Sequence, residues 1–150
     1  MTHANARSPA YAWRHVVGFG ETNLLGNVYF SHPVAWQGRC REMFLRDHAP
    51  EVLVELAKDL RLVTLDVSCA YRDELFAFDE VEIRMRLASV AEHRIGLEFE
   101  YLVTREGRDV VAAEGRQEVG CMRSGPNGLT PTQVPACLLR ALEPFGAITP

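Results

Sequence analysis

Alternation of apolar and polar residues through the second half of this chain is the feature that most limits its fold. The segment 80–87, EVEIRMRL, has Val, Ile, Met and Leu at every second position and charged residues between them. A period of two with one polar face predicts antiparallel strands that are wetted on one side. The same alternation, with Arg105-Glu106-Gly107-Arg108 as a hairpin signal, predicts strands over 62–71, 95–101 and 109–122.

The strand over 62–71 is assigned two faces by simple alternation. One face carries Leu65, Val67, Cys69 and Tyr71. The other face carries Thr64, Asp66 and Ser68.

One long helix is available to cover the apolar face of such a sheet. Residues 32–48 have helical periodicity, and aromatic and β-branched residues over 11–19 predict a first strand. One strand, one buried helix and then four strands predict an α+β protein, with a curved antiparallel sheet of about five strands wrapped round the helix. At about 100° per residue, the buried stripe of the helix is expected to consist of Trp36, Cys40, Met43 and Phe44.

The remaining segments carry weaker patterns. Residues 1–10 are polar and small, and we predict that they are disordered. Residues 50–60 predict a second short helix and residues 132–145 a terminal one. Residues 124–131, SGPNGLTP, predict a loop because they are rich in Gly and Pro. No repeat or linker interrupts the chain, so residues 1–150 are expected to form a single domain.

Composition excludes several classes of function. The net charge of −4 does not favour nucleic-acid binding. No apolar run is long enough for a membrane span, and the first residues lack the apolar core of a secretory signal, so we expect a cytoplasmic protein. The four cysteines and five histidines have no spacing typical of a metal or redox site. We therefore predict neither a metal nor another cofactor.

The stretch from residue 19 to residue 45 carries the chemistry. A polar turn, ETNLLGN, is followed by Val28-Tyr29-Phe30 and then by the helix with its segment WQGRCRE. Such a turn delivers the carboxamide of Asn23 to the start of a mostly apolar helix. This order resembles the hotdog-fold acyl thioesterases of the 4-hydroxybenzoyl-CoA thioesterase type, in which the loop reads roughly F-x-D-x-D-x-x-G-x-V-Y-F. Here Glu21 and Asn23 replace the two acids.

The closest resemblance is to the thioesterases of enediyne polyketide biosynthesis, because of Asn23 and the helix segment over 36–42. It implies a hotdog fold, a homo-oligomer built as a dimer of dimers, and hydrolysis of a β-keto polyene thioester carried by an acyl carrier protein. The phosphopantetheine would then belong to the substrate. The His32-Pro33 pair departs from that group, which tends to have Asn-Tyr at this point.

Thioester hydrolysis depends mainly on stabilisation of the oxyanion, for which one donor can supply about 3–4 kcal/mol. The resemblance implies that Asn23 and Arg41 polarise the thioester, and that Thr64 lines the same cavity. Glu21 is the nearby carboxylate that could act as a base. The substrate-binding residues implied by the motif and the helix start are Gly26, Asn27, Tyr29, His32 and Val34.

Each candidate also has a structural interpretation. Asn23 could form an Asx-turn. Arg41 could pair on the helix surface with Glu42 or Asp47. Glu21 could cap the turn or pair with an arginine. Two alternatives to the polyketide reaction are an acyl-CoA thioesterase of general metabolism and a non-catalytic domain that binds acyl chains.

Overall fold

The computed structural model describes residues 9–146, and its elements follow the predicted order. The prediction of disorder over 1–10 concerns mainly residues 1–8, which lie outside the described residues. The elements are β1 (Tyr11–Val16), a 3-10 helix (Phe19–Glu21), α1 (Ser31–His48), α2 (Pro50–Leu56), β2 (Leu60–Tyr71), β3 (Glu80–Val90), β4 (Arg94–Arg105), β5 (Arg108–Gly125), β6 (Gly128–Pro131), α3 (Ala136–Leu142) and a 3-10 helix (Glu143–Phe145).

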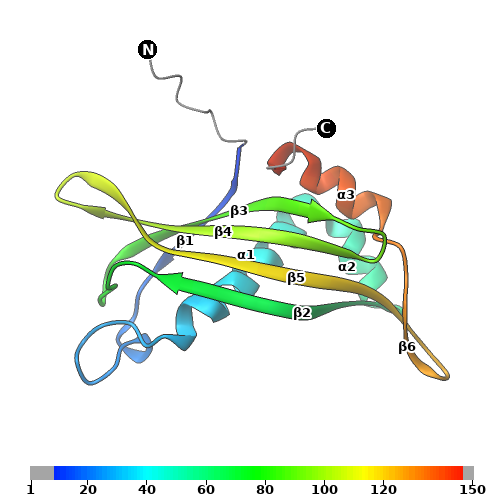
Figure 1. The fold of residues 1–150 in the computed structure, drawn as a ribbon, viewed down its shortest axis with the longest axis horizontal. Helices are drawn as coiled ribbons and strands as arrows, with labels where there is room; N and C mark the ends of the chain where they lie inside the picture. Colours follow the sequence, from blue (N-terminus) through cyan, green and yellow to red (C-terminus); the bar gives the residue numbers. More distant parts are fainter. Residues whose placement is uncertain (1–8, 147–150) are drawn as a thin grey trace, which may run out of the picture.

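The strands form one antiparallel sheet in the order β1-β3-β4-β5-β2, and β6 pairs with β5. Figure 1 shows the sheet curving across α1, with α2 on the same side and α3 at one end. The inner face of the sheet, which lies against α1, is built from the apolar positions of the alternating strands. This confirms the predicted α+β architecture of a curved sheet wrapped round one long helix.

Helix α1 is held against this face by its buried stripe. Trp36, Cys40 and Phe44 are buried as predicted, whereas Met43 is only half-buried at the edge of the core. Leu45 is buried too, so the helix is covered on more than one side. Pro33 is tolerated in the first turn because an N–H there would have no partner within the helix. Gln37 is fully buried as well, although the sequence did not predict it.

Two of the predicted boundaries are wrong. Strand β1 ends at Val16 rather than at Phe19, which begins a 3-10 turn after Gly18. Residues 124–131 form the end of β5 and all of β6, a hairpin that turns at Pro126-Asn127, rather than a loop. Gly128 at the end of this turn has a φ of 97°, which glycine adopts at low cost. The hairpin predicted at Glu106-Gly107 is confirmed.

Strand β2 carries a bulge between Thr64 and Asp66. The extra residue, Leu65, lies against Gly120. Thr64 instead lies opposite buried Val119 and so joins the inner face. The predicted faces of this strand are therefore wrong at Thr64 and Leu65, because one added residue reverses the alternation.

Strand β2 also ends the sheet. Beyond it, no further strand of the described chain pairs with its outer edge. Val67 and Tyr71, which alternate on its inner face, remain 40% and 49% exposed. A twelve-residue edge strand with exposed apolar side chains is a ready template for pairing with another chain.

Candidate active site

The loop before α1 presents the carboxamide of Asn23 with its donor group free. Asn23 Oδ1 accepts a hydrogen bond from Leu25 N at 2.8 Å, which closes an Asx-turn. The backbone N–H of Asn23 donates to Asn27 O at 2.8 Å, and Gly26 has a φ of 89° that favours glycine. Asn23 Nδ2 makes no hydrogen bond within the described chain. The turn therefore fixes the carboxamide and leaves its N–H groups available to a ligand.

Glu21 anchors this loop to its neighbours. Its Oε1 accepts a hydrogen bond from Gly18 N at 3.0 Å and lies 2.7 Å from His15 Nε2, while Oε2 accepts from Trp36 Nε1 at 2.7 Å. Burial alone would raise the pKa of Glu21, but these hydrogen bonds outweigh burial and leave the pKa below its usual value. Both carboxylate oxygens are therefore engaged in joining β1, the 3-10 turn and α1.

The predicted substrate-binding residues surround the start of α1. Tyr29 donates its backbone N–H to Glu21 O at 2.9 Å and exposes 47% of its surface. Asn27 donates to Glu74 Oε1 at 3.5 Å, while its own Oδ1 is buried without a hydrogen-bond partner. His32 and Val34 are half-buried in the first turn of the helix.

Arg41 projects from the middle of α1 toward β2 and β5. Its Nη1 donates to Gln117 Oε1 at 2.9 Å and to Thr64 Oγ1 at 3.3 Å. Burial lowers the pKa of its guanidinium, an effect that nearby Glu42 partly offsets, but arginine stays charged in proteins. Arg41 is thus a half-buried cation whose hydrogen bonds go to neutral groups.

The structural interpretation of Arg41 as half of a surface ion pair does not hold for this chain. Glu42 pairs with Arg39 at 3.2 Å, and Asp47 pairs with Arg46 at 2.9 Å. Among the described residues, Arg41 forms no ion pair. Its positive charge is therefore available to an anion that develops beside it.

A small apolar cavity adjoins Arg41. It has a volume of about 10 Å³ and lies between α1, the inner face of the sheet and α3. Arg41 is the one charged residue in its lining, and the others are apolar side chains that include Phe44, Leu62 and Leu138. A cavity of this size holds about one water molecule. Its chemistry suits an acyl chain, for which the lining side chains would have to move apart.

Within one chain, Asn23 does not meet Arg41 and Thr64. Ten residues of α1 separate Ser31 from Arg41, which corresponds to about 15 Å along the helix axis. The loop that carries Asn23 precedes Ser31 and extends beyond the N-terminal end of the helix (Figure 1). The structure therefore joins Arg41 and Thr64 and leaves Asn23 beyond the N-terminal end of α1.

Sequence reasoning missed Gln117 and Gln37, the two buried glutamines beside this site. Gln117 occupies an inner position of β5, where alternation calls for an apolar side chain. Gln37 lies one turn before Arg41 on α1. In both cases the sequence did contain a signal for a buried functional residue, namely a polar residue within a run of otherwise apolar inward-facing positions.

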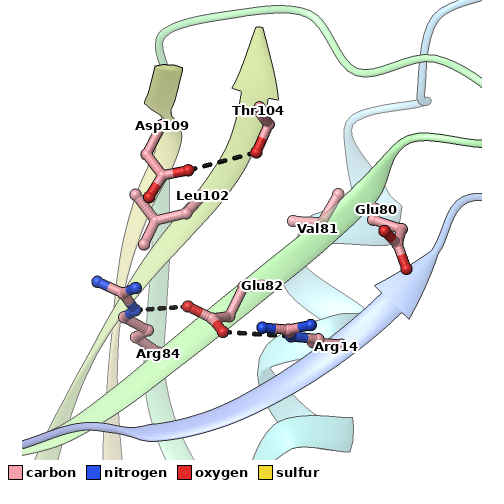
Figure 2. A pocket seen from close by; sticks show the side chains of 8 residues that line it. All are labelled: Arg14, Glu80, Val81, Glu82, Arg84, Leu102, Thr104 and Asp109. Atoms are coloured by element: carbon pink, nitrogen blue, oxygen red, sulfur yellow. Dashed lines mark hydrogen bonds and ion pairs between the residues drawn. The ribbon is translucent and has the colours of Figure 1, made fainter. Parts of the chain in front are cut away.

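A larger hollow of about 210 Å³ lies on the outer face of the sheet, away from α1. Figure 2 shows Glu82 between Arg14 and Arg84, with Asp109 bonded to Thr104. Its charged groups are largely paired with one another, and the sheet separates them from Arg41. This hollow therefore has no part in the candidate site.

No group of three or more His, Cys, Asp or Glu side chains is arranged to hold a metal ion between residues 9 and 146. No helix in that part of the chain is long and apolar enough to cross a membrane.

The profile of the thioesterase-like superfamily matches residues 17–142, so the chain belongs to that superfamily. Its fold is the hotdog fold, as predicted, and the protein is a thioester hydrolase. More particularly, it is similar to the dynemicin thioesterase, whose crystal structures revealed induced-fit and allosteric effects upon polyene binding. The two share 50% sequence identity over 93% of this chain and 99% of that chain, with a TM-score of 0.89.

More distant structures share the fold alone. A 4-hydroxybenzoyl-CoA thioesterase mutant complexed with 4-hydroxybenzoyl-CoA is 11% identical, with a TM-score of 0.81 over 90% of this chain and 99% of that chain. A 1,4-dihydroxy-2-naphthoyl-CoA thioesterase from Synechocystis is 16% identical, with a TM-score of 0.75 over 89% and 95%. No curated protein sequence matches this one significantly.

Proposed function

We propose that this protein hydrolyses a polyketide acyl thioester from the acyl carrier protein of an iterative enediyne synthase. The observation that carries the proposal is Arg41, a half-buried cation without an ion-pair partner among the described residues, beside an apolar cavity. The 50% identity to the dynemicin thioesterase, whose structures describe induced-fit and allosteric effects upon polyene binding, supports a polyene substrate.

In the proposed mechanism, hydrogen-bond donors stabilise the oxyanion while a water molecule attacks the thioester carbonyl. Arg41 supplies a charged donor in a site of low dielectric, where such a donor can lower the barrier by about 3–4 kcal/mol. Asn23 supplies its free Nδ2, and Thr64 orients the guanidinium. A carboxamide cannot act as a nucleophile or general base at ordinary pH, so the carboxylate mechanism is not available at position 23. Glu21 anchors the Asn23 loop, and its use as a base is the alternative.

Antiparallel pairing of β2 with β2 of a second copy would bring Asn23 and Arg41 together. Arg41 contacts Thr64, near the start of β2, while Tyr71 at its end donates its hydroxyl to Phe30 O beside the Asn23 loop. Antiparallel pairing places the end of one strand next to the start of the other. The loop of one protomer then approaches Arg41 of the other, so each dimer would contain two composite sites.

The test of the function is turnover of one β-keto acyl chain on two carriers. We expect hydrolysis of the thioester on an acyl carrier protein, with a kcat/KM at least roughly tenfold above that of the matching CoA thioester, because discrimination reflects differential transition-state binding. Release of free thiol can be followed for both. Equal rates would favour an acyl-CoA thioesterase of general metabolism, and absence of turnover on both would contradict the proposal.

The composite site predicts an obligate oligomer. Light scattering at micromolar concentration should give a dimer or a tetramer of two dimers, because pairing covers the exposed edge of β2. Mixing the Asn23→Ala and Arg41→Ala proteins, each of low activity alone, under conditions of subunit exchange should restore activity to roughly a quarter of wild type. Half of the dimers would then be mixed, each with one intact site. A monomer, or a mixture without activity, would contradict shared sites.

A further inference from the structure

Gln37 is a buried polar residue that the proposed mechanism leaves unexplained. It is fully buried in α1, and its Nε2 donates to the backbone carbonyl of Ser68 in β2 at 3.0 Å. Its Oε1 is buried without a hydrogen-bond partner. Burial of an unsatisfied carbonyl destabilises the folded state, a cost that an apolar side chain at this position would avoid. The carboxamide therefore does not serve stability alone.

Gly115 of β5 has no side chain and so leaves the space that this carboxamide occupies. A Cβ atom at position 115 would lie 2.0 Å from Gln37 Nε2 and 2.9 Å from Ser68 O. Any larger residue there would expel the carboxamide or displace β2. Gln37 and Gly115 are thus complementary, and together they fix the position of α1 over the β2–β5 pair.

Gln37 and Arg41 form a two-point attachment between α1 and this part of the sheet. Four residues of helix rise about 6 Å, and two residues of strand span about 7 Å. The spacing of Gln37 and Arg41 along α1 therefore matches the spacing of their contacts along β5. Gln37 lies against Gly115, and Arg41 donates to Gln117. On β2, the same two side chains reach Ser68 and Thr64.

We propose that Gln37 is a positioning residue for Arg41, and this inference rests on the proposed function. Arg41 has a long and flexible side chain, so the point from which it projects decides where its guanidinium meets the thioester. Gln37 fixes this part of α1 from one helical turn away, through its contact with Gly115 and its hydrogen bond to Ser68 O. A displacement of a catalytic group by about 1 Å can cost 10²-fold in rate.

The test is Gln37→Met, which keeps an unbranched side chain of similar length and removes the hydrogen bond. We expect kcat to fall by roughly 10- to 100-fold with KM changed less than about threefold, because a misplaced donor weakens transition-state stabilisation. The melting temperature should stay close to that of wild type, since the buried unsatisfied oxygen is lost as well. In an Arg41→Ala background, Gln37→Met should lower kcat further by less than about threefold.

Cys40→Ala is the matched control, because Cys40 is a buried residue of the same helix that faces β3, with its Sγ 3.9 Å from Ile83 O. It should lower the melting temperature and leave kcat close to wild type. A Gln37→Met protein with full kcat, or with the same loss in the presence and absence of Arg41, would overturn the assignment. Wild-type protein without thioesterase activity would instead contradict the proposed function, so the two failures are distinguishable.

Discussion

Replacement of Arg41 by alanine should lower kcat for thioester hydrolysis by roughly one to three orders of magnitude, the range found when one oxyanion donor is removed. The half-buried Arg41 donates from its guanidinium to Thr64 and Gln117 and makes no ion pair with a described residue, so its charge is free to act on a substrate. Because this contribution is made in the transition state, kcat should fall more than KM rises. The measurement is steady-state kinetics with the carrier-bound thioester.

Arg39→Ala is the matched control for this prediction. Arg39 lies on the same helix, carries the same charge and pairs with Glu42 on the surface, where its side chain is 56% exposed. Such pairs contribute little, so Arg39→Ala should retain both activity and stability. Equal activity of Arg41→Ala and wild type would remove Arg41 from the mechanism. Equal losses in both variants would indicate a general effect of net charge rather than a donor at the site.

The helices and most strands could be predicted because their signals are local. Helical periodicity identified α1 to within one residue at its start, and alternation identified the four strands of the second half. The β6 hairpin was missed because Gly and Pro mark a turn without showing whether the chain pairs afterwards. The short pairing of Gly128–Pro131 with the end of β5 depends on a partner strand rather than on its own pattern.

The site was less predictable because its contacts connect distant segments. Simple alternation placed Thr64 on the opposite face from Val67, whereas the bulge in β2 brings both onto the inner face, where Thr64 meets Arg41. Gln117 is separated from Arg41 by 76 residues and meets it across the helix–sheet interface. No periodicity in either segment encodes that contact. The family resemblance supplied Arg41 and Asn23, but it did not indicate that Asn23 lies beyond the N-terminal end of α1 while Arg41 projects from the middle of that helix.

The Asx-turn at Asn23 explains how one residue can satisfy both interpretations made from the sequence. The turn uses Oδ1 as an acceptor, while donation to an oxyanion requires Nδ2. The structural role therefore holds the carboxamide in place for the catalytic one. Substitutions at this position must be interpreted with the turn in mind, because Asn23→Ala removes the acceptor and the donor at once.

Asn23→Ala should lower turnover by about 10²-fold or more, as loss of an oxyanion-hole donor does. Asn23→Asp separates the two roles, because aspartate keeps the Asx acceptor for Leu25 N and replaces the donor by a negative charge. If Asn23 stabilises an anion, this charge repels the developing oxyanion, and activity should fall at least as far as in Asn23→Ala. Asn23→Ser, which offers a hydroxyl to the turn without adding a charge, is the control.

The pH–rate profile gives an independent readout for the same position. A carboxamide does not titrate, so the wild-type profile should have no limb attributable to residue 23. Asn23→Asp should introduce such a limb near the ordinary pKa of a carboxylic acid, with residual activity highest at low pH, where the acid is protonated and can again donate a hydrogen bond. Turnover that instead rises with pH to well above wild type would mean that the site is an impaired carboxylate site, and the donor role of Asn23 would be wrong.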